Sequence, residues 1–405
     1  MYWRNALRQK NVWREFFPVF IIIVNSLTWN TLTYAIFSNL INNLPISPIE
    51  TMTLFGIHYV GVTCSLILGS IFFPRARKKF LSLWMLTGTV ISILLISIPS
   101  NDISVNMFIS FFFGVSVGTG LPSSLACFAD ATITENRGFF GGITFFFVGF
   151  VTMLFVVITL LTDNIVVALM VTAWRILGLI LFLSTFKDKK AEQAQKVPSY
   201  ASVLGKRELF LYLVPWVMFC LVNWMEAPLL ENLFGDLYSL IGFIEVAIAG
   251  LFALAGGIIA DFSGRKRVII IGFVILGIEY AMLSLLSGVS VSWCIYTAFD
   301  GIAWGMFASV FFMTLWGDLA GGYEKEKYYV VGGLPYLLAG FLSILVKPYV
   351  GVIPLGTAFS LASFFLFLAV LPLMYAPETL PEKKIREREL KDYIEKAKKI
   401  REKHP

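Results

Sequence analysis

Residues 256–267 read Gly256-Gly-Ile-Ile-Ala-Asp261-Phe-Ser-Gly264-Arg265-Lys266-Arg267 and separate two long apolar runs, 237–260 and 268–287. Each run has about the 20 apolar residues that a helix needs to cross the hydrocarbon core of a bilayer. The segment is therefore predicted to be a short turn between two transmembrane helices. Its three basic residues also predict an orientation, because Lys and Arg concentrate in loops on the cytoplasmic side.

Similar apolar runs fill most of the chain. We predict twelve transmembrane helices, at 17–40, 51–73, 80–98, 105–128, 139–161, 165–186, 209–230, 237–260, 268–287, 292–316, 328–347 and 354–376. The composition agrees, since 58% of the 405 residues are hydrophobic and only 14% are charged, whereas soluble domains carry about 25% charged residues. These proportions exclude an ordinary soluble enzyme, a disordered chain and a disulfide scaffold.

The basic residues are distributed very unequally over the predicted connections. With the N-terminus in the cytoplasm, all but two of the 32 Lys and Arg residues fall in cytoplasmic segments. The exceptions are Lys347, in an outer connection, and Arg175, inside the sixth run. This asymmetry predicts a multi-pass protein of the cell membrane with both termini in the cytoplasm, and it supports the count of twelve.

The two halves of the chain resemble each other. Residues 69–79, Gly69-Ser-Ile-Phe-Phe-Pro-Arg-Ala-Arg-Lys-Lys79, match 256–266 at an offset of 187, and Asp130 and Asp318 each end a long run. The predicted organisation is an N-terminal arm (1–16), a first six-helix bundle (17–186), a basic linker (187–208), a second six-helix bundle (209–376) and a charged tail (377–405) with a helix at 382–403. Repeated halves are typical of secondary transporters, whose site lies between them.

Three motifs resemble the major facilitator superfamily. Residues 256–267 are similar to its cytoplasmic loop between helices 8 and 9, and Gly114-x-x-x-Gly118-x-Gly120-Leu-Pro122 is similar to its helix 4. Pro377-Glu378-Thr379 resembles the ending of its sugar-porter branch. The resemblance covers residues 15–380 and implies an all-α membrane protein, with 12 transmembrane helices in two pseudo-symmetric six-helix bundles.

The resemblance also implies a gate at the cytoplasmic side. Its residues are Gly256, Asp261, Gly264 and Arg265, which would hold the outward-facing state closed on that side. The alternative is a surface turn whose basic residues only set the topology.

The first half departs from the family pattern. At the offset of 187, Pro74 stands in the position of the acid and Arg77 in that of the second glycine. Ser110 replaces an Arg that proton-coupled relatives carry early in helix 4. The resemblance therefore leaves the coupling mechanism open.

The tenth run contains a carboxylate among aromatic residues. Tyr296, Asp300 and Trp304 lie on one helical face. A charge near the bilayer centre costs about 2.5–3.5 kcal/mol, so Asp300 is a candidate to bind a cation, a polar solute or a proton. The alternative is a structural hydrogen bond to a neighbouring helix.

Helices 1, 4, 7 and 10 carry most polar and aromatic residues, and the same helices line the cavity in the family. The predicted substrate-cavity residues are Asn25, Trp29, Asn30, Tyr34, Ser116, Thr119, Ser123, Trp216, Asn223, Trp224, Glu226, Tyr296, Asp300 and Trp304. The alternative for any one of them is interhelical hydrogen bonding, worth about 0.6 kcal/mol. Arg175, Glu245 and Glu279 also lie at membrane depth, where either ion coupling or structural pairing would explain them.

The expected function is secondary active transport of a small solute by a monomer in contact with membrane lipid, driven by a proton or solute gradient. A passive facilitator is the alternative that the missing helix 4 Arg favours. A transporter-fold sensor would need a larger soluble domain than the tail. An enzyme is not expected, because two histidines and four scattered cysteines form no metal-ligand spacing. No nucleotide-binding motif occurs, so we expect no cofactor, and no nucleic-acid partner.

Overall fold

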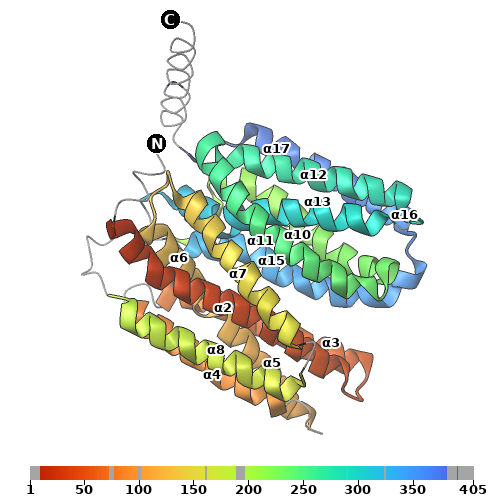
Figure 1. Cartoon of the computed structure of the whole chain (residues 1–405), viewed down its shortest axis with the longest axis horizontal. Coiled ribbons are helices and arrows are strands. Elements are labelled where there is room, and N and C mark those ends of the chain that lie inside the picture. The colour runs from red at the N-terminus through yellow and green to blue at the C-terminus, as the bar shows by residue number, and fades with distance from the viewer. Residues whose placement is uncertain are drawn as a thin grey trace, which may run out of the picture.

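The computed structural model describes residues 10–72, 77–97, 102–159, 162–187, 197–289, 291–322, 325–380 and 390. Within these ranges the chain is almost entirely helical and forms no strand (Figure 1). The predicted tail helix, apart from residue 390, and residues 188–196 of the predicted linker lie outside the described residues.

The first half contains six membrane-length segments. They are α2 (Lys10–Asn42), α3 (Pro48–Phe72), α4 (Arg77–Leu94) with the 3-10 turn η1 (Leu95–Ser97), α5 (Ile103–Gly118) continued by α6 (Leu121–Ala131), α7 (Arg137–Thr159) and α8 (Asn164–Thr185). The break between α5 and α6 falls at Gly120, just before Pro122, because proline lacks the N–H that a continuous helix requires. Helix α2 begins at Lys10, so part of the predicted N-terminal arm is helical.

The second half repeats this order after the short helix α9 (Tyr200–Leu204). Its segments are α10 (Arg207–Phe234), α11 (Leu237–Ser263), α12 (Arg265–Leu286), α13 (Ser292–Phe307) continued by the π-helix η2 (Ala308–Thr314) and α14 (Leu315–Ala320), α15 (Glu326–Val346) with the 3-10 turn η3 (Lys347–Val352), and α16 (Leu355–Leu368) continued by α17 (Val370–Tyr375). Each of the twelve predicted runs coincides with one of these segments.

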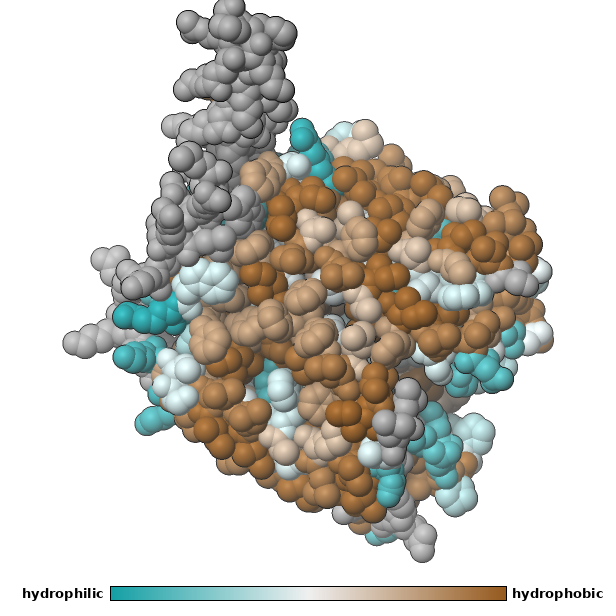
Figure 2. All heavy atoms as spheres, in the orientation of Figure 1, coloured by the Kyte–Doolittle hydropathy of each residue, from teal (hydrophilic) through white to brown (hydrophobic). Residues whose placement is uncertain are grey.

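Eleven helical segments of the described chain are long and apolar enough to cross a membrane. Helix α4 is the twelfth segment, and its 18 residues begin with three basic side chains, Arg77, Lys78 and Lys79. Figure 2 shows apolar side chains over most of the visible face, with hydrophilic residues gathered toward its ends. Large apolar residues such as Leu169, at 56% exposure, remain uncovered. Lipid is the environment that such a surface fits.

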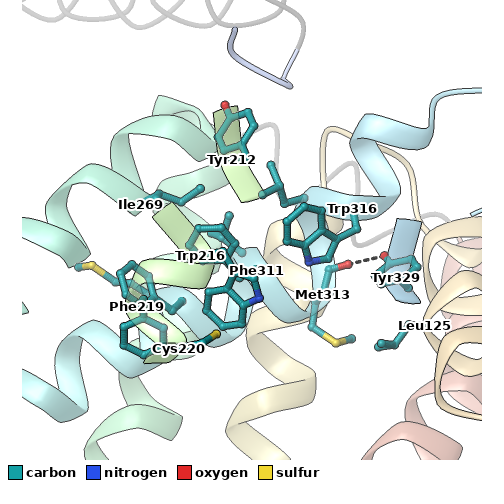
Figure 3. Packing of buried hydrophobic residues seen from close by; sticks show 14 of the residues in the cluster. Leu125, Tyr212, Trp216, Phe219, Cys220, Ile269, Phe311, Met313, Trp316 and Tyr329 are labelled. Carbon is teal, nitrogen blue, oxygen red and sulfur yellow. Dashed lines mark hydrogen bonds between the residues drawn. The ribbon is translucent and has the colours of Figure 1, made fainter. Parts of the chain in front are cut away.

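The helices form two bundles, and the fold is the all-α, twelve-helix arrangement that the sequence predicts. Helices α2 to α8 lie together on one side of the molecule and α10 to α17 on the other (Figure 1). Aromatic side chains fill much of the second bundle. In Figure 3, Trp216 packs against Phe219 and Phe311, and the Tyr329 hydroxyl donates to the Met313 carbonyl at 2.7 Å.

The bundles meet along α7 with α11 and along α3 with α15. Glycines allow the first of these crossings. Gly138 and Gly142 of α7 lie directly against Gly257 and Ala253 of α11, and a Cβ at Gly257 would overlap the carbonyl oxygen of Gly138. We call the contact surface between the two bundles the seam.

Gly257→Val is expected to destabilise the protein by about 1–3 kcal/mol, because the added side chain meets backbone that cannot move aside. Gly242→Val is the matched control on the same helix, since no atom lies within 4 Å of its Cβ position. Thermal unfolding of both variants in detergent measures the difference. Equal melting temperatures would show that α7 and α11 do not cross this closely.

Candidate functional site

Charged residues gather at one end of the molecule, which we call the basic end. It contains Arg77, Asp130, Arg137, Asp261, Arg265, Asp318, Lys325 and Glu326. Gly264, with φ of 99°, makes the turn between α11 and α12 and places Arg265 at the first position of α12.

Asp318 joins the two bundles at this end. Its carboxylate forms ion pairs with Arg137, at the start of α7, and with Arg265, at 3.1 Å. The Asp318 side chain has no exposed surface. Arg137 also donates to the Ala129 carbonyl, and Arg265 donates to Thr134 across the seam. Buried charges in this arrangement have hydrogen-bond partners that offset part of their desolvation.

A second network repeats this arrangement. Asp130 pairs with Arg77 of its own bundle at 2.5 Å and with Lys325 of the other bundle. Arg77 also reaches Glu326, at the start of α15, at 2.7 Å. The two networks are therefore related by the pseudo-symmetry of the bundles.

The networks correct the register of the internal repeat. Arg77, Asp130 and Arg137 correspond to Arg265, Asp318 and Lys325, each 188 residues later. The offset of 187 places Arg77 opposite a glycine, and this assignment is wrong, because Arg77 binds Asp130 as Arg265 binds Asp318. The first half has therefore kept the arginine of the motif.

Asp261 adds a contact that the first half lacks. Its carboxylate accepts from the backbone N–H groups of Gly138 at 2.9 Å and Phe139 at 2.8 Å, in the first turn of α7, and it pairs with Arg265 at 2.8 Å. A carboxylate at this position satisfies free N–H groups and the positive end of the helix dipole. Positions 73 and 74, its counterparts at either offset, hold Phe and Pro.

Glu378 of the Pro-Glu-Thr motif holds the start of α12. It accepts from the backbone N–H groups of Arg265 at 2.8 Å and Lys266 at 3.1 Å. Pro377 is fixed by the Tyr212 hydroxyl, which donates to its carbonyl at 2.6 Å. The motif therefore fixes the helix that carries Arg265.

Four acids lie inside the second bundle. Asp300 of α13 and Glu245 of α11 are within hydrogen-bonding reach of each other, and Tyr296 also reaches Asp300. Glu279 of α12 is close enough to Glu245 and Asp300 to interact electrostatically. Asp300 is 2% exposed and Glu279 is fully buried, with neither of its carboxyl oxygens hydrogen-bonded among the described residues. Three helices thus bring these side chains together.

Glu226 is a fourth buried acid of this bundle. It lies on α10, is 7% exposed and has one unpartnered oxygen. Tyr280 of α12 is within electrostatic range of Glu226, Glu279 and Asp300. None of the four acids forms an ion pair with a described Lys or Arg.

The first bundle contains a buried cation, Arg175, where the second bundle contains buried acids. It is fully buried, and it donates to the Asn25 amide oxygen at 3.1 Å and to the Ser26 hydroxyl at 2.6 Å. Its guanidinium lies 4.7 Å from the ring centre of Trp29 and 4.8 Å from that of Trp84. Two indole faces, the Asn25 amide oxygen and the Ser26 hydroxyl therefore surround this cation.

Several predicted cavity residues lie within a bundle rather than at the seam. Asn25 and Trp29 face α8 and α4, where Trp29 donates to Ser92 at 2.7 Å. Trp216 is buried and donates to the Gly332 carbonyl at 2.6 Å. Ser116 and Thr119 donate to carbonyls of their own helix, and Ser123 is buried with an unpartnered hydroxyl.

Other predicted residues are less buried. Asn30, Tyr34, Asn223, Trp224 and Trp304 are partly exposed. The Tyr34 hydroxyl is 2.9 Å from that of Tyr59, and both are within electrostatic range of Tyr336 on the opposite bundle.

The predicted site residues did not include Tyr59, Tyr336 and Phe312 at the seam, or Arg137 and Lys325 at the basic end. The recurrence of Arg, Asp and a second basic residue at one offset could have identified the last two. No comparable signal marks the aromatic residues, because aromatics are frequent in every run. Among the described residues, no group of three or more His, Cys, Asp or Glu side chains is arranged to hold a metal ion.

Asp318→Asn is expected to destabilise the protein by about 3–5 kcal/mol, because it leaves Arg137 buried without a carboxylate. The control is Glu231→Gln, which breaks an exposed pair with Lys347 and is expected to change stability by at most about 1 kcal/mol. Thermal unfolding in detergent compares them. A loss in the control as large as that in Asp318→Asn would contradict the assignment.

Comparison with known proteins addresses the fold. No protein-family model and no curated protein sequence matches the chain. It is similar in structure to the human organic anion transporter MFSD10 (TETRAN), with a TM-score of 0.69, 12% identity, and coverage of 90% of this chain and 100% of that one.

Two symporter structures are also similar. The proton:xylose symporter XylE gives a TM-score of 0.68 at 13% identity over 91% of this chain and 96% of that one. The major facilitator superfamily transporter FucP, in its outward conformation, gives a TM-score of 0.69 at 10% identity. The match covers 90% of this chain and 100% of that one. With its two helical bundles and the signature loop between α11 and α12, this chain has the fold of a major facilitator superfamily transporter.

Proposed function

We propose that this protein is a secondary active transporter, which moves a small solute across the cell membrane and uses protons as the coupling ion. One observation carries the proposal: Asp300, Glu245 and Glu279 are packed together inside the second bundle with no cationic partner among the described residues. The transporter fold supports solute transport, and this cluster of acids supports coupling to protons.

The acids require protons for a physical reason. Carboxylates that share a poorly solvated site repel one another, so they do not all ionise together. Contact between the carboxyl groups of Asp300 and Glu245 also needs a proton on one of them, since ionised carboxylates only accept hydrogen bonds. Facing Asp300 are Glu245, Glu279 and Tyr296, so no fixed positive charge can replace that proton. Access of water to the cluster would then control the release of the proton.

The basic end supplies the gate in this proposal. Asp261 and Arg265, with Gly264 in the turn between their helices, hold α11 and α12 against the start of α7, while Gly256 lies inside α11 against Met306 of α13. Both ion networks must open before the solute site can reach this side. The excess of basic residues favours placing this end, and both termini, in the cytoplasm. The site lies between bundles of one chain, so a monomer suffices.

A passive facilitator is the second candidate. Ser110 stands in the position of the helix 4 Arg of proton-coupled relatives, and it donates to the Asn106 carbonyl of its own helix at 2.7 Å. No charge replaces the missing Arg at that position.

Asp300→Asn is expected to abolish solute accumulation driven by a pH gradient while leaving solute exchange at equilibrium intact. Exchange needs no net proton movement, whereas accumulation does. The measurement uses proteoliposomes and a solute found by a thermal-shift screen of sugars, organic acids, amino acids and cations. Glu231→Gln is the control and should keep both activities.

Unchanged accumulation in Asp300→Asn would remove this residue from the coupling mechanism. Wild-type uptake that only equilibrates the solute at every pH gradient would favour the passive facilitator.

Asp130→Asn combined with Asp318→Asn should open the basic end. Cys127, 5% exposed on α6 beside this network, is a native reporter in a variant whose Cys64, Cys220 and Cys294 are Ser. Its labelling by a membrane-impermeant maleimide should accelerate at least ~10-fold, corresponding to a loss of about 1.4 kcal/mol. Labelling as slow as in the parent would show that these carboxylates do not hold the end closed.

A further inference from the structure

Three aromatic side chains of the second bundle pack directly on a fourth, Tyr336 of α15, at the seam. They are Trp224 of α10, Trp304 of α13 and Phe312 of η2. The Tyr336 ring centre is 5.6 Å from that of Trp224, 5.7 Å from that of Trp304 and 5.0 Å from that of Phe312. We call this group the aromatic box.

The box faces the first bundle and is incompletely covered. All four residues are partly exposed, whereas the neighbouring Phe219 is buried. Phe312 contacts Phe145 of α7 at 5.6 Å between ring centres, and Tyr336 is within electrostatic range of Tyr34 of α2. Ring surface is therefore available at the seam, where the proposed transport site lies.

Carboxyl groups lie close to the box. Glu245 is partly exposed and is within electrostatic range of Tyr336. Its partner Asp300 precedes Trp304 by one helical turn and keeps one unpartnered oxygen. Two independent features, the aromatic faces and the unpaired buried carboxyls, thus meet at one place.

No positive charge balances this group within the described residues. Arg175, the buried cation at membrane depth, lies in the other bundle between Trp29 and Trp84. An anionic solute would therefore meet carboxyl groups and electron-rich ring faces, and both repel it.

The chemistry favours one solute class. Aromatic faces attract cations, and the attraction grows when both partners lose water. A sugar needs many hydrogen-bonding groups, and the rings of the box offer only three, the indole N–H groups of Trp224 and Trp304 and the Tyr336 hydroxyl. An inorganic cation needs several converging oxygen ligands, and the described acids form no such group.

We propose that the solute of this protein is an organic cation of the quaternary-ammonium type, held by Trp224, Trp304, Phe312 and Tyr336, with Glu245 as its counter-ion. This inference rests on the proposed transport function and names the substrate class of the same site. It also links solute to coupling, since a cation beside Glu245 would replace the proton that Glu245 shares with Asp300.

The test is equilibrium binding to the purified full-length protein in detergent. The probes are choline, tetraethylammonium and benzyltrimethylammonium, together with 3,3-dimethylbutanol, which has the shape of choline without its charge. At least one cation should bind, and choline should bind at least ~10-fold more tightly than the neutral analogue.

Variants separate the contribution of charge from that of the rings. Glu245→Gln should weaken cation binding ~10-fold or more and leave the neutral analogue unaffected. Glu231→Gln, the exposed control, should change neither. Trp304→Leu should weaken cation binding and Trp304→Phe should restore most of it, which keeps the test decisive if Glu245→Gln does not fold.

Failure of all three cations to bind would overturn the inference, as would equal affinity for choline and its neutral analogue. Flux of a sugar or an organic anion without cation binding would overturn it while leaving the transport proposal intact. Cation binding without flux of any solute in proteoliposomes would support the site and refute transport.

Discussion

The carboxylate of Asp318, held between Arg137 of one bundle and Arg265 of the other, is the contact on which the arrangement at the basic end depends. All three side chains are almost completely removed from solvent. Charges in that position must find partners inside the protein, because lipid offers none. Through this contact, through its counterpart at Asp130 and through Asp261 at the start of α7, the two bundles close at one end.

Three pairs of charged residues follow the pseudo-symmetry of the halves at the basic end, whereas the buried charged residues of the interior do not follow it. At the end, acid and base recur in equivalent positions, so each network is balanced. Inside, the first bundle holds a cation, Arg175, among indole rings, and the second holds four acids without a base among the described residues. Buried ionisable groups without a charged partner destabilise a fold. They are candidates for function, because ions or protons that come and go can compensate them.

Helical periodicity predicts which residues share a face, but not which neighbour that face meets. Asn25 and Trp29 share a polar face with other predicted cavity residues, yet they turn toward α8 and α4, where they surround Arg175. Glu245, Glu279 and Asp300 look unrelated in the sequence, because each lies on a different helix. Their proximity is a property of how α11, α12 and α13 pack.

The sequence alone determined the number of helices, their approximate limits, the repeat and the motif between α11 and α12, because hydrophobic length and loop charge are local properties that a bilayer requires of every span. Only the tertiary structure decided the repeat offset of 188 residues, the partners of Arg175, the proximity of Glu245, Glu279 and Asp300, and the packing of the aromatic box. These depend on crossings between helices, such as the glycine contact of α7 with α11, and small residues that allow close approach leave no periodic signal in so apolar a chain.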